Sequence, residues 1–286
     1  MRICSYIPIR QTREGVITAM RAKTDRTGLL LILPSLTGVC AFYVIPFLSS
    51  LYYTFTQGVS EPRFVGLANF RDLLDSPVFR QAVGNTALFL ILGVPLALAC
   101  ALLLSVVLAK GSFPWQRWAL LLPFVLPASS LAVAWQGMWG KEALNGPTAL
   151  PLTLLLYLLR NTGYLSVILT GAIRALPVEY QESCCLDGGG EGRYLVHVLI
   201  PLLSPTLLFA GIVAVMNYFL LFRDVYMLYG DSPPRRLYML QHFMNSSFYR
   251  LNYQRLGAAA FVTVLVLSAL VAAVLLLQRR VKSHVE

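Results

Sequence analysis

Six long runs of apolar residues, separated by short polar segments, dominate the sequence. Each run is close to the roughly 20 residues that an α-helix needs to cross the hydrocarbon core of a bilayer. The runs extend over residues 28–55, 81–109, 115–139, 148–175, 202–229 and 256–277. This pattern predicts an all-α fold, a polytopic membrane helical bundle with six transmembrane helices.

Prolines occur inside two of the predicted spans. Pro34 and Pro46 lie in the first span, and Pro123 and Pro127 lie in the third. In water such prolines argue against a helix, but in a membrane bundle neighbouring helices and hydroxyl side chains can satisfy the carbonyl groups that proline leaves free. We therefore expect these residues to bend the two helices rather than to end them.

Composition and charge agree with a membrane protein. Hydrophobic residues make up 57% of the chain and charged residues 13%, and the formal net charge is +10. The connectors that we assign to the cytoplasm hold 13 Lys and Arg residues, against 8 in the outer connectors, and cytoplasmic loops carry such an excess. No basic face with interleaved aromatic residues is present, which argues against nucleic acid as a partner.

The same charge pattern gives the expected organisation of the chain. We place a cytoplasmic N-terminal segment at 1–27, a transmembrane domain at 28–280 and a cytoplasmic tail at 281–286, so that both termini are cytoplasmic. Within the domain, 177–201 forms a cytoplasmic loop. Residues 1–19 are polar and basic and lack the pattern of a cleavable signal peptide. Translation could begin at Met1 or at Met20, and the sequence leaves both open.

The loop between the fourth and fifth spans has an unusual composition. It predicts a helix opened by Pro177, a break at three successive glycines, 188–190, and a second helix that ends near Pro201. Glu179, Glu182 and Leu186 fall on about one face of the first helix. Such a helix can lie in a groove of a soluble partner, with the glycines setting its angle.

Residues of this loop carry a family resemblance. Glu182-Ser-Cys, then Asp187-Gly188, then nine residues, then Val198-x-Ile200-Pro201 resembles the E-A-A-x-x-x-G-x9-I-x-L-P signature of permease subunits of ATP-binding-cassette (ABC) importers. Ser183 and Cys184 replace the two alanines and are also small. Three further segments are similar to parts of the carbohydrate-type permeases: 64–70, 122–128 and 222–230.

The resemblance implies a permease subunit in an inner (plasma) membrane that moves a sugar or a similar polar solute through the lipid bilayer. The implied partners are cytoplasmic ATPase subunits, a second permease subunit and an extracytoplasmic solute-binding protein. The G-x-x-x-x-G-K-[ST] phosphate-binding pattern does not occur here, so we expect no cofactor on this chain, with ATP and Mg bound by the partner ATPase. The residues implied to couple to that ATPase are Glu179, Glu182, Ser183, Cys184, Asp187, Gly188 and Pro201.

Polar residues inside the spans are candidates for the solute pathway, because polar groups in a membrane are functional by default. We select four that offer the planar hydrogen-bonding groups or aromatic faces that sugars use: Asn161, Gln136, Asn217 and Tyr218. Interhelical hydrogen bonding is an equally good explanation for any one of them. For Arg160 and Trp135 it is the preferred explanation.

Two other classes of membrane protein remain as alternatives. An integral membrane enzyme needs a cluster of titratable residues, but His197, His242 and His284 lie in three separate segments, and the five cysteines lack metal-ligand or redox spacing. An ion-coupled secondary transporter usually has acidic residues at mid-membrane, and none lies well inside the six predicted spans. We therefore expect a transport protein rather than an enzyme. The sequence does not identify the solute.

Overall fold

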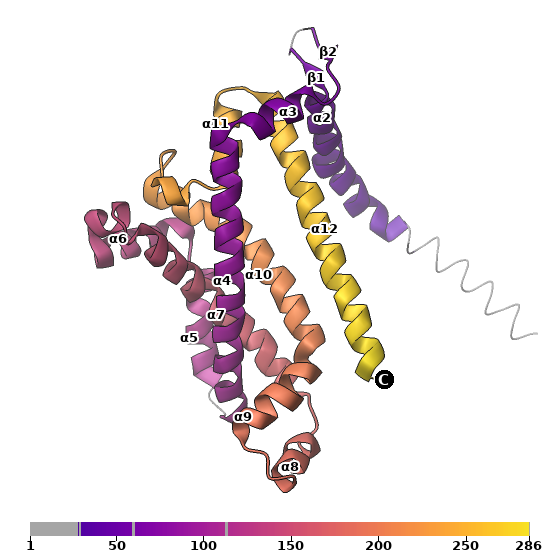
Figure 1. The fold of residues 1–286 in the computed structure, drawn as a ribbon, viewed down its shortest axis with the longest axis vertical. Coiled ribbons are helices and arrows are strands. Elements are labelled where there is room, and N and C mark those ends of the chain that lie inside the picture. Colours follow the sequence, from indigo (N-terminus) through magenta and orange to yellow (C-terminus); the bar gives the residue numbers. More distant parts are fainter. Residues whose placement is uncertain (1–27, 29, 59–60, 112–113, 286) are drawn as a thin grey trace, which may run out of the picture.

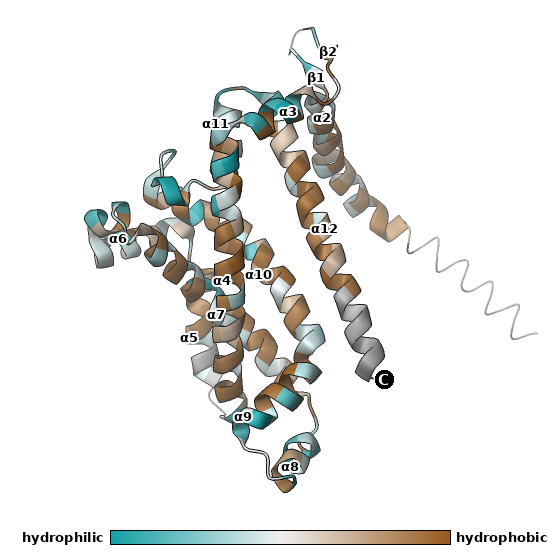
Figure 2. Cartoon of the chain, viewed as in Figure 1, coloured by the Kyte–Doolittle hydropathy of each residue, from teal (hydrophilic) through white to brown (hydrophobic). Residues whose placement is uncertain are grey.

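The computed structural model describes residues 28, 30–58, 61–111 and 114–285, so the predicted N-terminal segment 1–27 lies outside the described residues. Long helices run along the long axis of the molecule and short elements cover its two ends (Figure 1). Apolar residues cover the long helices, whereas hydrophilic residues gather near both ends (Figure 2). This distribution is that of a bundle that crosses a membrane.

Five helices of the described chain are long and apolar enough to span a bilayer. They are Leu30–Thr54, which includes the π-helical turn η1 (Cys40–Val44) and α2 (Ile45–Thr54), then α4 (Pro77–Lys110), α7 (Ala149–Arg174), α10 (Ile200–Tyr229) and α12 (Tyr253–Val285). The first helix continues through Pro34 and Pro46, as expected. Because α12 extends to Val285, most of the predicted tail 281–286 prolongs the last helix.

The third predicted span is not one bent helix, which corrects the expectation from the sequence. α5 (Pro114–Val125) and α6 (Ala128–Asn145) meet at an angle of 100°. Pro127 occupies the N-cap position of α6 with φ −56° and ψ 144°, and proline also disfavours helical geometry at the residue before it. The chain therefore breaks at Leu126 and Pro127, and the bundle has six spans only if α5 and α6 count as one.

Pro201 does not end a helix, which is a second correction. α9 (Glu191–Tyr194), η2 (Leu195–Leu199) and α10 form one continuous helical segment, 191–229. η2 is a π-helical turn, closed by the amide of Ile200 on the carbonyl of Leu195. Pro46 likewise directly follows a π-helical turn, η1, which the amide of Ile45 closes by donating to the carbonyl of Cys40. In both places a wider turn precedes the proline, which lacks the amide that a regular α-helix requires.

Short elements cover the end of the bundle opposite α8. They are β1 (Thr56–Gln57), β2 (Arg63–Phe64), α3 (Ala68–Asp75), η3 (Arg235–Leu237) and α11 (Leu240–Tyr249). The strands pair antiparallel, with Thr56 opposite Phe64. Buried Asn69 donates to the carbonyls of Thr54 and Thr56 at 2.9 and 3.0 Å. This side chain therefore fastens α3 to the end of the first spanning helix.

α7 is the central helix and packs against α4, α5 and α10. Three buried aromatic side chains fill the contact between α4, α7 and α10: Phe89, Tyr157 and Tyr218. Tyr157 also donates from its hydroxyl to the carbonyl of Ala214 at 2.8 Å. In contrast, no side chain among the described residues of the first helix before Thr54 is buried, and α2 meets the bundle at α12.

Candidate functional site

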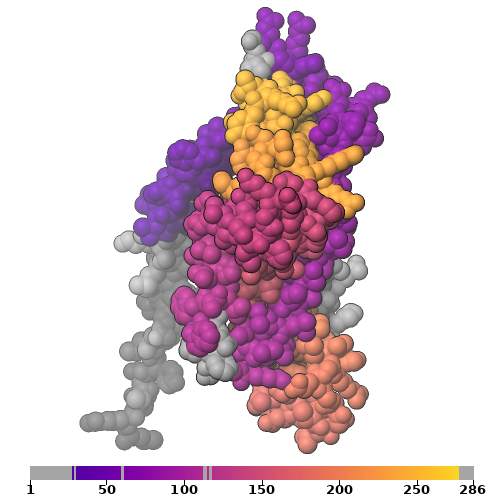
Figure 3. Space-filling view, turned by 90° about the vertical axis from the view of Figure 1, so that its left-hand side faces the viewer, coloured from indigo at the N-terminus to yellow at the C-terminus, as the bar shows by residue number. Residues whose placement is uncertain are grey.

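The helix with the family signature, α8 (Glu179–Leu186), lies beyond the ends of the spanning helices. It forms one tip of the molecule (Figures 1 and 3). Glu179 and Glu182 are exposed, and Leu186 is 88% exposed. Both glutamates lie in the first turn, where negative charge is favourable because the helix dipole is positive there. The helix thus offers a mixed acidic and apolar surface to a partner.

The glycines after α8 end the helix with a defined geometry. Gly188 has a φ of +74°, a region that residues with a Cβ rarely adopt. The amide of Gly188 donates to the carbonyl of Cys185 at 3.0 Å, and the amide of Gly189 donates to the carbonyl of Cys184 at 2.8 Å. These two bonds form a Schellman C-cap. The cap fixes the direction in which the chain leaves α8.

Small residues are required inside this turn. A Cβ at Gly189 would lie 2.6 Å from the sulfur of Cys184 and 2.8 Å from its carbonyl oxygen. Cys184 is buried, whereas Ser183 and Asp187 are exposed. Of the seven residues implied to couple to an ATPase, six therefore lie in or directly after α8. Pro201 does not, because it lies in the first turn of α10.

Two basic residues bond the ends of α4 and α7, and one of them also contacts the segment after α8. Lys110 at the end of α4 forms an ion pair with Glu191 of α9, with 2.5 Å between Nζ and Oε1. Arg174 at the end of α7 donates to the carbonyls of Leu108, at 2.9 Å, and of Gly111. The ends of α4 and α7 are therefore bonded to each other and to the segment that follows α8.

A second candidate site is a polar cavity of about 190 Å³ between α7 and α10. It is lined by Phe124, Arg160, Asn161, Asn217, Leu220, Leu221, Arg223 and Asp224. Asn161 donates to the carbonyl of Tyr157 at 2.8 Å, but its Oδ1 atom is buried without a partner among the described residues, and so is Nδ2 of Asn217. An unpaired acceptor and an unpaired donor can bind the hydroxyl groups of a polar solute.

The other two predicted pathway residues lie outside this cavity. Gln136 of α6 donates from Nε2 to the carbonyl of Leu228 at 3.2 Å. Tyr218 is buried in the aromatic contact with Phe89 and donates to the sulfur of Met239 at 3.2 Å. Their observed contacts are interhelical, and the geometry brings together only Asn161 and Asn217 of the four.

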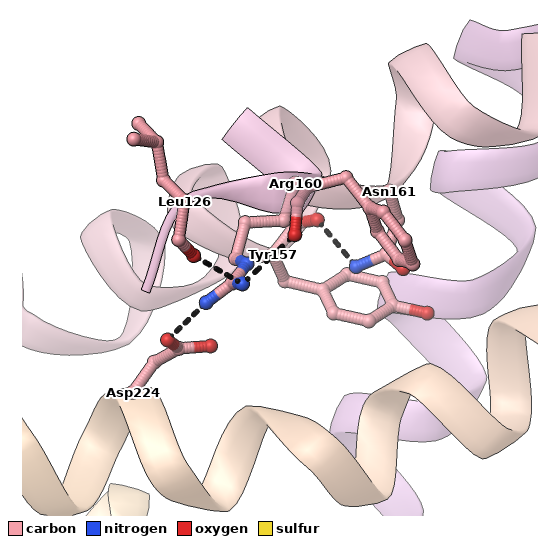
Figure 4. Close-up of polar contacts among 6 residues, drawn as sticks. Leu126, Tyr157, Arg160, Asn161 and Asp224 are labelled. Carbon is pink, nitrogen blue, oxygen red and sulfur yellow. Dashed lines mark hydrogen bonds and ion pairs between the residues drawn. The ribbon is translucent and has the colours of Figure 1, made fainter. Parts of the chain in front are cut away.

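Asp224 is a buried acidic residue of α10, which corrects the expectation that no acidic residue lies well inside a predicted span. It lies within the predicted fifth span and forms an ion pair with Arg160, where the two side chains are 6% and 12% exposed. Arg160 also donates to the carbonyl of Leu126 (Figure 4). The signal in the sequence is one acidic residue in the fifth apolar run and an arginine in the interior of the fourth run, which in a membrane predicts that the two pair.

The described part of the chain contains no group of three or more His, Cys, Asp or Glu side chains that could hold a metal ion. The arrangement that is present consists of hydrogen-bonding side chains around a small cavity and an exposed capped helix at one tip. It can bind a polar molecule and a soluble partner at two separate places.

Comparison with known proteins identifies relatives along most of the chain. The family described as "Binding-protein-dependent transport system inner membrane component" matches residues 78–286. The sulfoquinovosyl glycerol transport system permease protein SmoG of Agrobacterium fabrum is 28% identical over 278 residues, which cover 87% of this chain and 89% of that protein. The trehalose/maltose transport system permease protein MalF of Thermococcus litoralis is 23% identical and covers 89% of this chain and 94% of its own length.

The fold also matches a solved structure. A chain of a bacterial ABC transporter involved in the import of the acidic polysaccharide alginate aligns with a TM-score of 0.72 at 18% sequence identity. The alignment covers 92% of this chain and 98% of that chain. The bundle therefore has the fold of an importer subunit over nearly its whole length.

Proposed function

Because this chain belongs to the family of binding-protein-dependent transport system inner membrane components, we propose that it forms, with a second permease subunit, the translocation pathway of an ABC importer for a carbohydrate or similar polar solute. The names of the relatives support the solute class, since they include permeases for sulfoquinovosyl glycerol and for trehalose and maltose. ATP is bound and hydrolysed on separate ATPase subunits.

The observation that carries this proposal is α8, an exposed helix held at a fixed angle at one tip of the bundle. Its C-cap at Gly188 is closed by two backbone hydrogen bonds, and α9 beyond it continues directly into α10. A push on α8 is therefore transmitted through the short capped turn at 187–190 to α9 and the spanning helix α10. This is the mechanical requirement for coupling ATPase closure to a change in the bundle.

The charge bias of the connectors supports the orientation. We place α8 and both termini in the cytoplasm, where α8 meets the ATPase, and α3 and α11 on the outer side, where a solute-binding protein delivers its cargo. A relative with this fold was solved as an alginate transporter in complex with an alginate pentasaccharide-bound periplasmic protein. By analogy, the outer end of this chain would receive such a partner.

The cavity between α7 and α10 is the proposed place of solute contact. Asn161 and Asn217 supply an acceptor and a donor that lack partners among the described residues. Burying such groups unpaired costs about 1–3 kcal/mol each, a cost that a solute hydroxyl would offset. We therefore assign these two side chains to the solute pathway. Gln136 and Tyr218, which make interhelical bonds, have a weaker claim to it.

The experiment is to isolate this chain by an affinity tag from its own membrane and to measure the ATPase that co-purifies. Glu182→Lys reverses a charge on the exposed face of α8 and should reduce both bound ATPase and solute-stimulated ATP hydrolysis severalfold. Asp72→Lys, an exposed charge reversal on α3 at the opposite end, is the matched control for ATPase binding and should leave the amount of bound ATPase unchanged. Equal ATPase recovery and stimulation for Glu182→Lys and wild type would refute the assignment of α8.

A further inference from the structure

The break between α5 and α6 leaves backbone groups that need partners. α5 ends at Val125, and the last carbonyl groups of any helix lack a hydrogen-bond donor from their own helix. Pro127 follows without an amide hydrogen. In a membrane each unsatisfied backbone group costs several kcal/mol, so a broken helix is tolerated only where other parts of the protein supply the missing bonds.

Arg160 of α7 supplies these bonds. One guanidinium nitrogen donates to the carbonyl of Phe124 at 3.2 Å and to the carbonyl of Leu126 at 3.1 Å. The other terminal nitrogen forms the ion pair with Asp224 of α10. In Figure 4 the Arg160 side chain lies between Leu126 on one side and Asp224 on the other. One side chain thus joins α7, α10 and the break.

We propose that Arg160 is the positioning residue that holds the α5–α6 break in place as a wall of the polar cavity, with Asp224 as its counter-ion. Phe124, Arg160 and Asp224 all line that cavity together with Asn161 and Asn217. The planar guanidinium suits this role because it presents five donors in a fixed fork, whereas lysine has a single ammonium group. Phe124 adds a contact to α7, since its ring stacks on Tyr164 at 4.5 Å.

The alternative role for Arg160 is that of a direct solute ligand. The carbonyl bonds argue against it, because two of its three acceptors are backbone atoms of the break itself. The alternatives also differ in what they predict without solute. A positioning residue determines where α6 lies in the empty protein, whereas a ligand has no effect there.

The test measures the position of α6 in the purified, solute-free protein. Spin labels are attached at Val133→Cys on α6 and Arg250→Cys after α11, both exposed positions, in a background where the five native cysteines are alanine. Pulsed electron paramagnetic resonance then gives the distance distribution between the labels. We expect Arg160→Leu to shift and broaden this distribution, and Arg160→Lys to restore it in part.

Two further variants keep the test decisive. Arg160→Leu with Asp224→Leu removes both charges, so that no unpaired buried charge destabilises the protein, but it still leaves the two carbonyls without a donor. We expect the shift to persist in this double variant. Arg174→Leu is the matched control, because Arg174, the last residue of α7, also donates to two carbonyls, and it should leave the distribution unchanged.

A parental distance distribution in the double variant would overturn the proposal, since ion pairing rather than the carbonyl bonds would then matter. A parental distribution in Arg160→Leu would overturn it as well. The effect on uptake rests on the proposed function: the same variants should raise the solute concentration needed for half-maximal transport. The distance measurement needs no transport, so failure of the proposed function and failure of this inference remain distinguishable.

Discussion

The amide of Gly189 donates to the carbonyl of Cys184 across 2.8 Å, and no side chain fits at position 189 because a Cβ would lie 2.6 Å from the cysteine sulfur. The capping turn after α8 therefore requires both a small residue at position 184 and a glycine at position 189. Here part of the signature is the cap that gives the docking helix its direction.

Replacing Gly188 should misdirect α8. Gly188 has a φ of +74°, where a side chain costs roughly 1–2 kcal/mol and a β-branched one more. We expect Gly188→Val to reduce ATPase co-purification several-fold. Gly190→Val is the control, since Gly190 has a φ of −80° and no heavy atom within 4 Å of an added Cβ. Equal losses in both variants would show that the backbone angle at 188 is not the cause.

Gly163 should be essential for the packing of α5 on α7. A Cβ at this position would overlap the carbonyl oxygen of Leu120, whereas a Cβ at Gly171, on the same helix, would meet no atom within 4 Å. We expect Gly163→Ala to destabilise the protein by about 1–3 kcal/mol and Gly171→Ala to be neutral or slightly stabilising. Melting midpoints of the purified variants check this, and a midpoint for Gly163→Ala at or above that of Gly171→Ala would contradict it.

Acid should destabilise the end of the bundle that carries α11. Burial lowers the pKa of His242 to about 4, against an opposing effect of Asp231. Below an unfolded pKa of about 6.5 the unfolded chain binds a proton that the folded protein does not, so stability falls by up to about 1.4 kcal/mol per pH unit until pH 4 is approached. The melting midpoint should therefore drop more between pH 7 and 5 in wild type than in His242→Gln. Parallel pH dependence of the two proteins would exclude His242 as the cause.

Loss of either cavity amide should weaken transport. Asn161→Ala and Asn217→Ala each remove an amide side chain that lines the cavity, and a net hydrogen bond of about 0.5–1.5 kcal/mol corresponds to roughly a twofold to tenfold change in affinity. Uptake of radiolabelled solute in cells with normal protein levels is the measurement. Asn145→Ala, an exposed amide at the end of α6, should behave as wild type. Wild-type uptake for both cavity variants would assign these residues to packing.

The orientation can be tested with a single cysteine at position 190. In the cysteine-free background, Gly190→Cys should be inert to a membrane-impermeant maleimide in intact cells and should react after permeabilisation, because Gly190 is exposed and assigned to the cytoplasm. A cysteine at Asp72, on the opposite end, should react in intact cells. The reverse pattern of labelling would invert the proposed topology.

The sequence predicted the features that depend on local composition. The five continuous spans follow from runs of apolar residues, and the helix with its glycine break at 188–190 follows from residue types whose conformational preferences are strong. The prolines were predicted less well. Pro46 and Pro201 both lie within continuous helices, because a π-helical turn precedes each of them. Pro127, in contrast, separates α5 from α6.

The features that sequence reasoning missed depend on partners distant in the chain. The break at Pro127 is stabilised by Arg160, which is 34 residues away from Leu126, and the role of Asp224 depends on the same arginine, 64 residues away. A single sequence gives the residues of such a network but not their pairing. For the same reason the sequence alone grouped Gln136 and Tyr218 with Asn161 and Asn217 in the solute pathway. In the structure only the two asparagines line the cavity, whereas Gln136 and Tyr218 bond to other helices.

α7 carries an arginine near its middle and another at its last residue, and each bonds to carbonyls at the end of a neighbouring helix: Arg160 at the end of α5, and Arg174 at the end of α4. The two arginines are separated by about four helical turns, or about 21 Å. α7 is therefore hydrogen-bonded to neighbouring helices at two levels along its length. One helix therefore connects the wall of the cavity, through Arg160, with the end of α4 that pairs with the segment after α8, through Arg174.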